Sequence, residues 1–270
     1  MRDIGAASDV RFQFGENWSR FLKCIDENRI RDAHDSLKRM LGCDTMEGKT
    51  FIDVGSGSGI FSLAARSLGA AVHSFDFDVQ SVRCTEELKR RYLSGDEGWK
   101  IQQGSILDDN FVASLGRFDV VYSWGVLHHT GAMWKALENA TKLLKPGGLL
   151  YISVYNDQGP LTRYWKIVKL AYNRSSVCRY FIILLHSPYL IGVRFLSRAI
   201  RGKSEYERGM SLWYDMLDWL GGYPFETAIP EEIVGFYLAM GFSPVKVITC
   251  GRRNGCNEYV FTSDPGLSGL

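Results

Sequence analysis

The chain has six cysteines but no Cys-x-x-Cys pair. A protein of 270 residues needs no disulfide framework to build a core, so we expect reduced, structural thiols. The first residues, Met-Arg-Asp-Ile-Gly, also lack the apolar segment of a secretory signal. On these grounds we expect a cytoplasmic protein.

A long hydrophobic run is absent as well. The apolar stretch at 180–185 is followed by His186 and Pro188, and it is much shorter than the ~20 residues that a membrane-spanning helix requires. We therefore expect no helix that crosses a membrane.

Acidic residues are missing from Pro160 to Ser204. Basic residues are frequent there and alternate with aromatic and aliphatic ones: Arg163, Lys166, Lys169, Arg174, Arg179, Arg194, Arg198, Arg201 and Lys203. Such a stretch could lie on an anionic membrane surface or cover a lipid-like, negatively charged substrate. It could equally be a helical lid that packs on its own core or on a second subunit of a homodimer. Because the net charge of the chain is only +2, nucleic acid is an unlikely partner.

Length and composition indicate one α/β unit with added segments. Hydrophobic residues make up 46% of the chain and charged residues 23%, which is typical of a globular protein. From residue 49 onward, strand-like and helix-like segments alternate, and this predicts a parallel sheet with helices on both faces. We expect one structural domain in four segments: helices at 1–48, a cofactor-binding core at 49–155, a helical substrate or lid insertion at 156–228, and completion of the sheet at 229–270.

A glycine-rich turn follows the first predicted strand. Residues 51–59 read Phe-Ile-Asp-Val-Gly-Ser-Gly-Ser-Gly and lead into a helical pattern. Alternating glycines let the backbone bend sharply and approach a ligand, and unpaired amides at the start of a helix favour an anionic group. The dinucleotide fingerprint requires a small third residue where Ile60 stands, so a dinucleotide is disfavoured.

The order of motifs resembles that of class I S-adenosylmethionine-dependent methyltransferases of the small-molecule-acceptor type. Asp53 precedes the glycine turn, Asp76 ends the second strand, and Gly104-Ser105-Ile106 is similar to the adenine-contacting turn of that family. Residues 118–129 are similar to its fourth motif, and Lys-Pro-Gly-Gly at 145–148 completes the set. The resemblance implies a Rossmann-like α/β fold with a seven-stranded, mostly parallel sheet and an antiparallel C-terminal strand.

The same resemblance implies S-adenosylmethionine as the cofactor and an approximate binding site for it. Asp76 takes the place of the carboxylate that holds the ribose, whereas Asp78 is expected to cap the helix that follows. The implied cofactor-binding residues are Asp53, Gly55, Ser56, Gly57, Gly59, Asp76, Phe77, Ser105, Ile106, Ser123 and Trp124.

Two adjacent histidines follow the fourth predicted strand. A histidine suits general-base chemistry at neutral pH, and we expect His129, or else His128, to take a proton from an acceptor hydroxyl. The pair could instead orient loops. Adjacent histidines with no acidic cluster beside them are a poor metal site, so no metal is expected.

The remaining candidates concern the acceptor. Tyr155 and Asn156 end the fifth strand, while Trp213 and Trp219 belong to an aromatic segment that could form an acceptor pocket or pack under the sheet. The fourth motif lacks Asn/Asp-Pro-Pro-Tyr/Phe, so base amines and glutamine amides are unlikely acceptors. We expect O-methylation of a small or lipid-linked molecule such as a quinone precursor, a sugar or a natural-product scaffold. The alternatives are an RNA-modifying methyltransferase and a non-catalytic binding protein with this fold.

Overall fold

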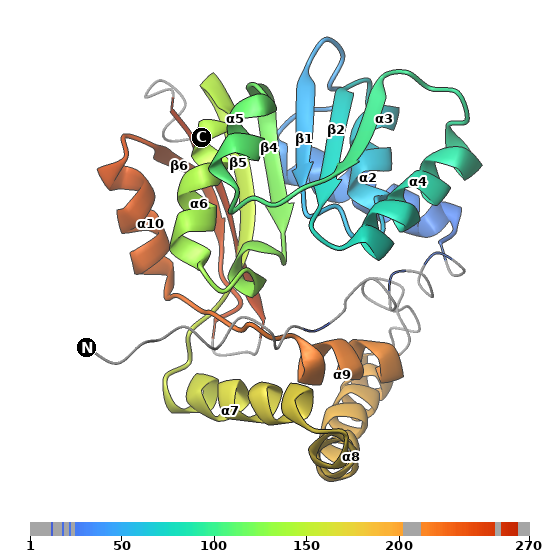
Figure 1. Cartoon of the computed structure of the whole chain (residues 1–270), viewed down its shortest axis with the longest axis vertical. Coiled ribbons are helices and arrows are strands. Elements are labelled where there is room, and N and C mark those ends of the chain that lie inside the picture. Colours follow the sequence, from blue (N-terminus) through green and yellow to red (C-terminus); the bar gives the residue numbers. More distant parts are fainter. Residues whose placement is uncertain are drawn as a thin grey trace.

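The computed structural model describes Phe12, Trp18, Leu22 and residues 25–201, 212–251 and 255–263. Within this part of the chain, seven strands form one sheet in the order β3-β2-β1-β4-β5-β7-β6 (Figure 1). The strands are β1 (Thr50–Val54), β2 (Ala71–Asp76), β3 (Trp99–Gln103), β4 (Phe118–Trp124), β5 (Leu144–Tyr155), β6 (Ser243–Ile248) and β7 (Cys256–Thr262).

Strands β1 to β5 pair in parallel, whereas β7 runs antiparallel between β5 and β6. The Rossmann-like seven-stranded sheet with an antiparallel C-terminal strand is thus confirmed. The strand order reverses between β1 and β4, and in open α/β sheets ligands bind beyond the carboxyl ends of the strands at such a switch point.

Helices cover both faces of the sheet. On one face, α2 (Glu27–Leu41), α3 (Ile60–Ser67) and α4 (Val79–Tyr92) bury their apolar sides against β-strand residues. On the other face, α5 (Asp109–Ser114), α6 (Met133–Lys142) and α10 (Pro230–Ala239) pack on a second apolar cluster. Removing two separate apolar layers from water stabilises the doubly covered sheet and positions the loops at its edge.

Local signals in the sequence place several helix ends. Asp78 caps α4, and its carboxylate accepts a hydrogen bond from the Gln80 amide at 2.8 Å, as expected. Pro230 is at the first position of α10, where the missing amide hydrogen costs nothing. Of the helices expected before the sheet, α2 is present, and the segment preceding it lies mostly outside the described residues.

The insertion forms a separate helical layer. It contains α7 (Pro160–Arg174), α8 (Ser176–Arg201) and α9 (Leu212–Gly221), which lie beyond the end of β5 (Figure 1). A third apolar cluster holds the three helices together, with Trp165, Tyr172, Leu190, Met216, Leu220 and Phe225 among its buried members. Phe12 packs on this cluster, and its amide donates to the Tyr223 carbonyl at 3.0 Å.

No helix in the described part of the chain is long and apolar enough to cross a membrane.

Candidate functional site

The glycine turn between β1 and α3 has a backbone that other residues could adopt only with strain. Gly55, Gly57 and Gly59 have φ values of 79°, 55° and 80°. A Cβ atom on Gly55 would lie 2.4 Å from Val126 Cγ1, and one on Gly57 would lie 3.0 Å from the Trp18 ring. The turn therefore needs glycine both for its conformation and for its close contacts.

The expectation of unpaired amides in this turn is wrong. The amides of Gly55 and Ser56 both donate to the Phe75 carbonyl, at 2.8 and 3.1 Å, and the Gly59 amide donates to the Ser56 carbonyl. The Gly57 amide donates to Asp76 Oδ2 at 3.0 Å. These bonds tie the turn to the end of β2, because the parallel pairing of β1 and β2 brings the two strand ends together. They shape the turn and leave these four amides engaged.

The Ser56 side chain also serves the turn. Its hydroxyl lies 3.0 Å from the Thr85 hydroxyl, and Thr85 in turn donates to the Gly57 carbonyl at 3.4 Å. Ser56 therefore joins the glycine turn to α4.

Asp76 lies beside the turn with both carboxylate oxygens engaged. Oδ2 accepts from Gly57 and Oδ1 accepts from the Asp78 amide at 2.9 Å. Burial raises the pKa of Asp76 to about 6, although the two amide bonds favour the charged form. A carboxylate oxygen has two lone pairs, so each oxygen can still accept a ligand hydroxyl. Phe77, the next residue, has an exposed aromatic side chain beside it.

Asp53 is buried beneath the turn. Its Oδ2 accepts from the Ser62 hydroxyl at 2.5 Å, and Ser62, Ser74 and the Trp99 indole form a chain of hydrogen bonds below it. Burial raises the pKa of Asp53 to about 7, because removal from water disfavours the ionised form and Asp76 adds negative charge nearby. Ionisation of the Asp53 carboxyl therefore destabilises the folded protein.

This burial predicts a stability that falls as the pH rises. In the unfolded chain an aspartate ionises near pH ~3.9, whereas folded Asp53 stays protonated up to about pH 7, so unfolding becomes easier as the pH rises through this window. From pH 5 to pH 8, the free energy of unfolding of the wild type should fall by roughly 3 kcal/mol relative to that of Asp53→Asn, whose side chain cannot ionise. Urea denaturation at the two pH values measures the change. Asp44→Asn removes an exposed carboxylate and controls for the change in net charge. The prediction would be refuted if Asp53→Asn and the wild type differed in free energy of unfolding by the same amount at both pH values.

Two glycines with the same φ test the close contact in the turn. Gly55 and Gly95 both have a φ of 79°, but a Cβ atom on Gly95 meets nothing within 4 Å. Either change to alanine should lower the free energy of unfolding by about 1–2 kcal/mol, because alanine disfavours the left-handed conformation. At Gly55 alone, overlap with Val126 should lower it by about 1–3 kcal/mol more. Chemical denaturation of Gly55→Ala and Gly95→Ala measures the difference, and equal losses would mean that Val126 moves aside without cost.

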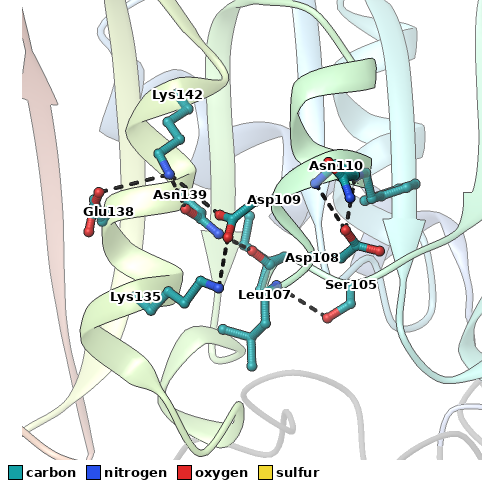
Figure 2. A network of polar contacts seen from close by, with 11 residues as sticks. Ser105, Leu107, Asp108, Asp109, Asn110, Lys135, Glu138, Asn139 and Lys142 are labelled. Carbon is teal, nitrogen blue, oxygen red and sulfur yellow. Dashed lines mark hydrogen bonds and ion pairs between the residues drawn. The ribbon is translucent and has the colours of Figure 1, made fainter.

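The turn after β3 is held rigidly by α6. Ser105 Oγ accepts from the Leu107 amide, while the Asn139 side chain donates to the Ile106 carbonyl at 2.8 Å (Figure 2). Asp109 pairs with Lys135 at 2.9 Å, and the hydrogen bond from this lysine lowers the pKa of Asp109. The side chain of Ile106 is buried in the core, so this residue can offer a ligand mainly its backbone.

Ser123 and Trp124 end β4, and both make contacts inside the protein. Ser123 is fully buried, and its hydroxyl donates to the Val54 carbonyl of β1 at 2.9 Å. Trp124 is partly buried against the cluster that contains α2 and α3. The Ser123 hydroxyl is therefore engaged between β4 and β1.

The histidine pair lies in a short 3-10 helix, Leu127–His129, just beyond β4. His129 is partly buried, and its Nδ1 lies 2.6 Å from the Pro224 carbonyl. Since a carbonyl can only accept, Nδ1 carries a hydrogen and the neutral ring has its lone pair on Nε2. His128 is fully buried, with its ring 4.4 Å from that of His129 and 4.2 Å from that of Tyr155.

Aromatic side chains extend this site into the insertion. The ring centre of Tyr155 lies 5.5 Å from that of Trp219 and 5.2 Å from that of Phe225. Lys169 is fully buried below them, with its Nζ 4.4 Å from the Trp219 ring centre and donating to the Trp219 carbonyl. The structure thus joins Tyr155, Trp219 and both histidines in one cluster.

The other two residues expected to contact the acceptor, Asn156 and Trp213, have different surroundings. The side-chain amide of Asn156 donates to the Gly251 carbonyl and accepts from Asn257, each at 3.0 Å, so it connects β5 to the turn before β7. Trp213 is 45% exposed on α9. Trp213 and Trp219 are six residues apart, a spacing that places them on different sides of α9.

Residues 224–226 belong to the site but were not predicted from the sequence. Besides the Pro224 carbonyl on His129, the Glu226 amide donates to the His128 carbonyl and Glu226 Oε2 accepts from Met133, both at 3.0 Å. Burial raises the pKa of Glu226. They lie next to residues 128–129 through contacts between segments almost a hundred residues apart in the chain. In the sequence, only Glu226, the acidic residue at the end of the aromatic segment, could have indicated a role here.

The residues at the switch point fit the hydroxyls and the flat ring of a nucleoside. Asp76 offers oxygens to two hydroxyls beside the tight glycine turn, and Phe77 offers an exposed apolar surface next to them. Hydroxyl donors and a flat ring are the groups that such a set of acceptors and apolar surfaces would hold.

Comparison with known proteins agrees with this fit. A family model described as a methyltransferase domain matches residues 25–183. The ubiquinone biosynthesis O-methyltransferase of Paraburkholderia xenovorans is 30% identical over 154 residues, 55% of this chain and 60% of that protein. The ribosomal protein L11 methyltransferase of Helicobacter hepaticus is 35% identical over 114 residues, 42% of this chain and 34% of that protein. In both cases the match spans less than two thirds of the relative.

A solved structure shares the fold over nearly the whole chain. Magnesium protoporphyrin IX methyltransferase from Synechocystis, with bound SAH, has a TM-score of 0.55 at 14% identity and covers 93% of this chain and 94% of its own.

Proposed function

The chain belongs to the class I methyltransferase-domain family, which uses S-adenosylmethionine as the methyl donor, and from this premise we propose that it methylates an oxygen atom of a small or lipid-linked molecule. The observation that carries this proposal is the position of His129. It follows β4 at the switch point, and the Pro224 carbonyl holds its Nδ1 at 2.6 Å. The similarity to an O-methyltransferase of ubiquinone biosynthesis supports a hydroxyl acceptor.

The glycine turn and Asp76 hold the cofactor in this proposal. Asp76 accepts from the ribose hydroxyls through the oxygens that also fix the Gly57 and Asp78 amides. Ser105 and Ile106 border the adenine through a turn that α6 keeps in place. Asp53 supports the turn from below and is too deeply buried to contact solvent. Bound S-adenosylmethionine supplies an electrophilic methyl group on its sulfonium.

His129 acts as the general base. With Nδ1 donating to Pro224, Nε2 is the atom that takes the proton from an acceptor hydroxyl as its oxygen is methylated. His128, fully buried between His129 and Tyr155, fixes the position of the base and does not itself meet the acceptor.

The aromatic cluster orients the acceptor. Tyr155 lies between the histidines and Trp219, with ring centres 4.2 to 5.6 Å apart. Aromatic walls with few polar groups suit a ring-shaped or isoprenoid acceptor, since they exclude water and leave orientation to one or two hydrogen bonds.

Formation of S-adenosylhomocysteine tests the proposal. We would compare dihydroxybenzenes, with and without an isoprenoid chain, with sugars and with RNA transcripts, and identify the methylated atom by mass spectrometry. Turnover with a hydroxyl acceptor is the expected result. Methylation of amines, RNA or a ribosomal protein alone would overturn the assignment of oxygen in a small molecule. Absence of heat in calorimetry at millimolar S-adenosylmethionine would refute the cofactor assignment itself.

A further inference from the structure

The outer side of α8 exposes an apolar stripe to solvent. Residues 177, 180, 181, 184, 185 and 189 follow the spacing of one helix face, and each is more than half exposed: Val177, Tyr180, Phe181, Leu184, Leu185 and Tyr189. Leu185 reaches 73%. Contiguous apolar surface of this kind is uncommon on a soluble monomer and marks a contact site.

The core of the insertion does not account for this stripe. The opposite side of α8 already packs inward, with His186 and Leu190 buried and Ile182 and Ile183 partly buried against the aromatic cluster. The helix is therefore apolar on both sides and covered on one.

Positive charge is exposed on α7, the helix that packs beside α8. On α7, Arg163 and Arg174 are exposed in one row with Ile167, which is itself 68% exposed. The sequence has no Asp or Glu from residue 160 to 204 that could neutralise them.

The charge distinguishes among the possible occupants. A closed dimer through α8 would bring the same patch of two chains together, and its basic residues would face one another with no carboxylate from this segment between them. An anionic lipid surface supplies both the apolar interior and the negative charge that the face lacks.

We propose that the face formed by α8 and the neighbouring basic row of α7 binds the surface of an anionic bilayer. The apolar stripe enters the boundary between headgroups and acyl chains, while the arginines contact lipid phosphates. Tyr180 and Tyr189 place their rings in the apolar layer and their hydroxyls at the headgroups. Since no described helix can cross a membrane, the contact is peripheral. It depends on this face alone and stands whatever the acceptor is.

Flotation with vesicles of phosphatidylcholine, with or without phosphatidylglycerol, tests this surface in the full chain. The wild type should float with the anionic vesicles, and high salt should weaken the binding. Leu185→Glu should weaken it about tenfold or more, because burial of a leucine is worth roughly that factor. Arg163→Glu with Arg174→Glu should weaken it about twentyfold or more, at about fivefold for each lost charge.

Matched variants outside the face control for the change of residue. Leu238→Glu, at a leucine 52% exposed on α10, introduces the same charge, and Lys100→Glu with Arg117→Glu matches the double charge reversal. Both controls should float as the wild type does. Far-UV circular dichroism checks that each variant is folded.

Three results would overturn the proposal. The wild type could fail to float with anionic vesicles, or Leu185→Glu could float as well as the wild type. Light scattering could also show a wild-type dimer that Leu185→Glu converts to a monomer, and the stripe would then bind a second copy of the chain.

Discussion

Replacing His129 with alanine should lower turnover by about 100-fold or more, because general-base catalysis by a positioned side chain contributes on the order of 10²–10⁴ in rate. The affinity for S-adenosylmethionine should change little, since His129 lies beyond β4 and apart from the Asp76 contacts at the end of β2. Turnover with a hydroxyl acceptor, together with calorimetric binding of the cofactor, measures the two effects separately.

His129→Asn separates catalysis from positioning. Asparagine offers an amide donor that can replace Nδ1 on the Pro224 carbonyl, but it cannot take a proton at neutral pH. We expect this variant to be as slow as His129→Ala, and added imidazole to restore part of the rate of the alanine variant. Full turnover in His129→Asn would show that the ring only holds the loop containing Pro224.

Replacing Asp76 with asparagine should weaken S-adenosylmethionine binding by about 100-fold or more, or roughly 3 kcal/mol. The carboxylate accepts from Gly57 on one oxygen and from Asp78 on the other. In either orientation of an asparagine amide, its NH₂ group would face one of these N–H donors, so the variant loses both charge and a correctly shaped turn. Titration calorimetry measures the affinity.

Asp78→Asn is the matched control, because it removes the same charge two residues away and asparagine still caps α4. Its affinity should stay within about twofold of the wild type. Equal affinities of Asp76→Asn and the wild type would show that the ribose is held elsewhere, provided that both proteins give the same far-UV spectrum.

The alternation of strands and helices and the helix ends near Asp78 and Pro230 followed from local sequence. Alternation of strand-like and helix-like segments, a capping carboxylate and a proline at the start of a helix each depend on a few neighbouring residues. The family motifs, being local too, identified the class of cofactor before any contact was known.

The hydrogen bonds of the glycine turn could not be predicted in the same way. Its amides were expected to be unpaired, yet they meet the Phe75 carbonyl and the Asp76 carboxylate because β1 and β2 end side by side. A single sequence does not specify which strand end will lie against a turn. The hydrogen bonds from the turn amides to Phe75 and Asp76 therefore could not be predicted.

What the sequence by itself determined is the chemistry at hand: an α/β sheet, a glycine turn followed by Asp76, two histidines after β4, and a basic segment without acids. The tertiary structure alone decided which groups meet. It brought Pro224 to His129 and Trp219 to Tyr155, engaged both ends of the Asn156 amide, and left one apolar side of α8 uncovered. The physical reason is that composition and spacing act over one or two helical turns, whereas these contacts join residues far apart in the chain and depend on how the helical layer packs beyond the sheet.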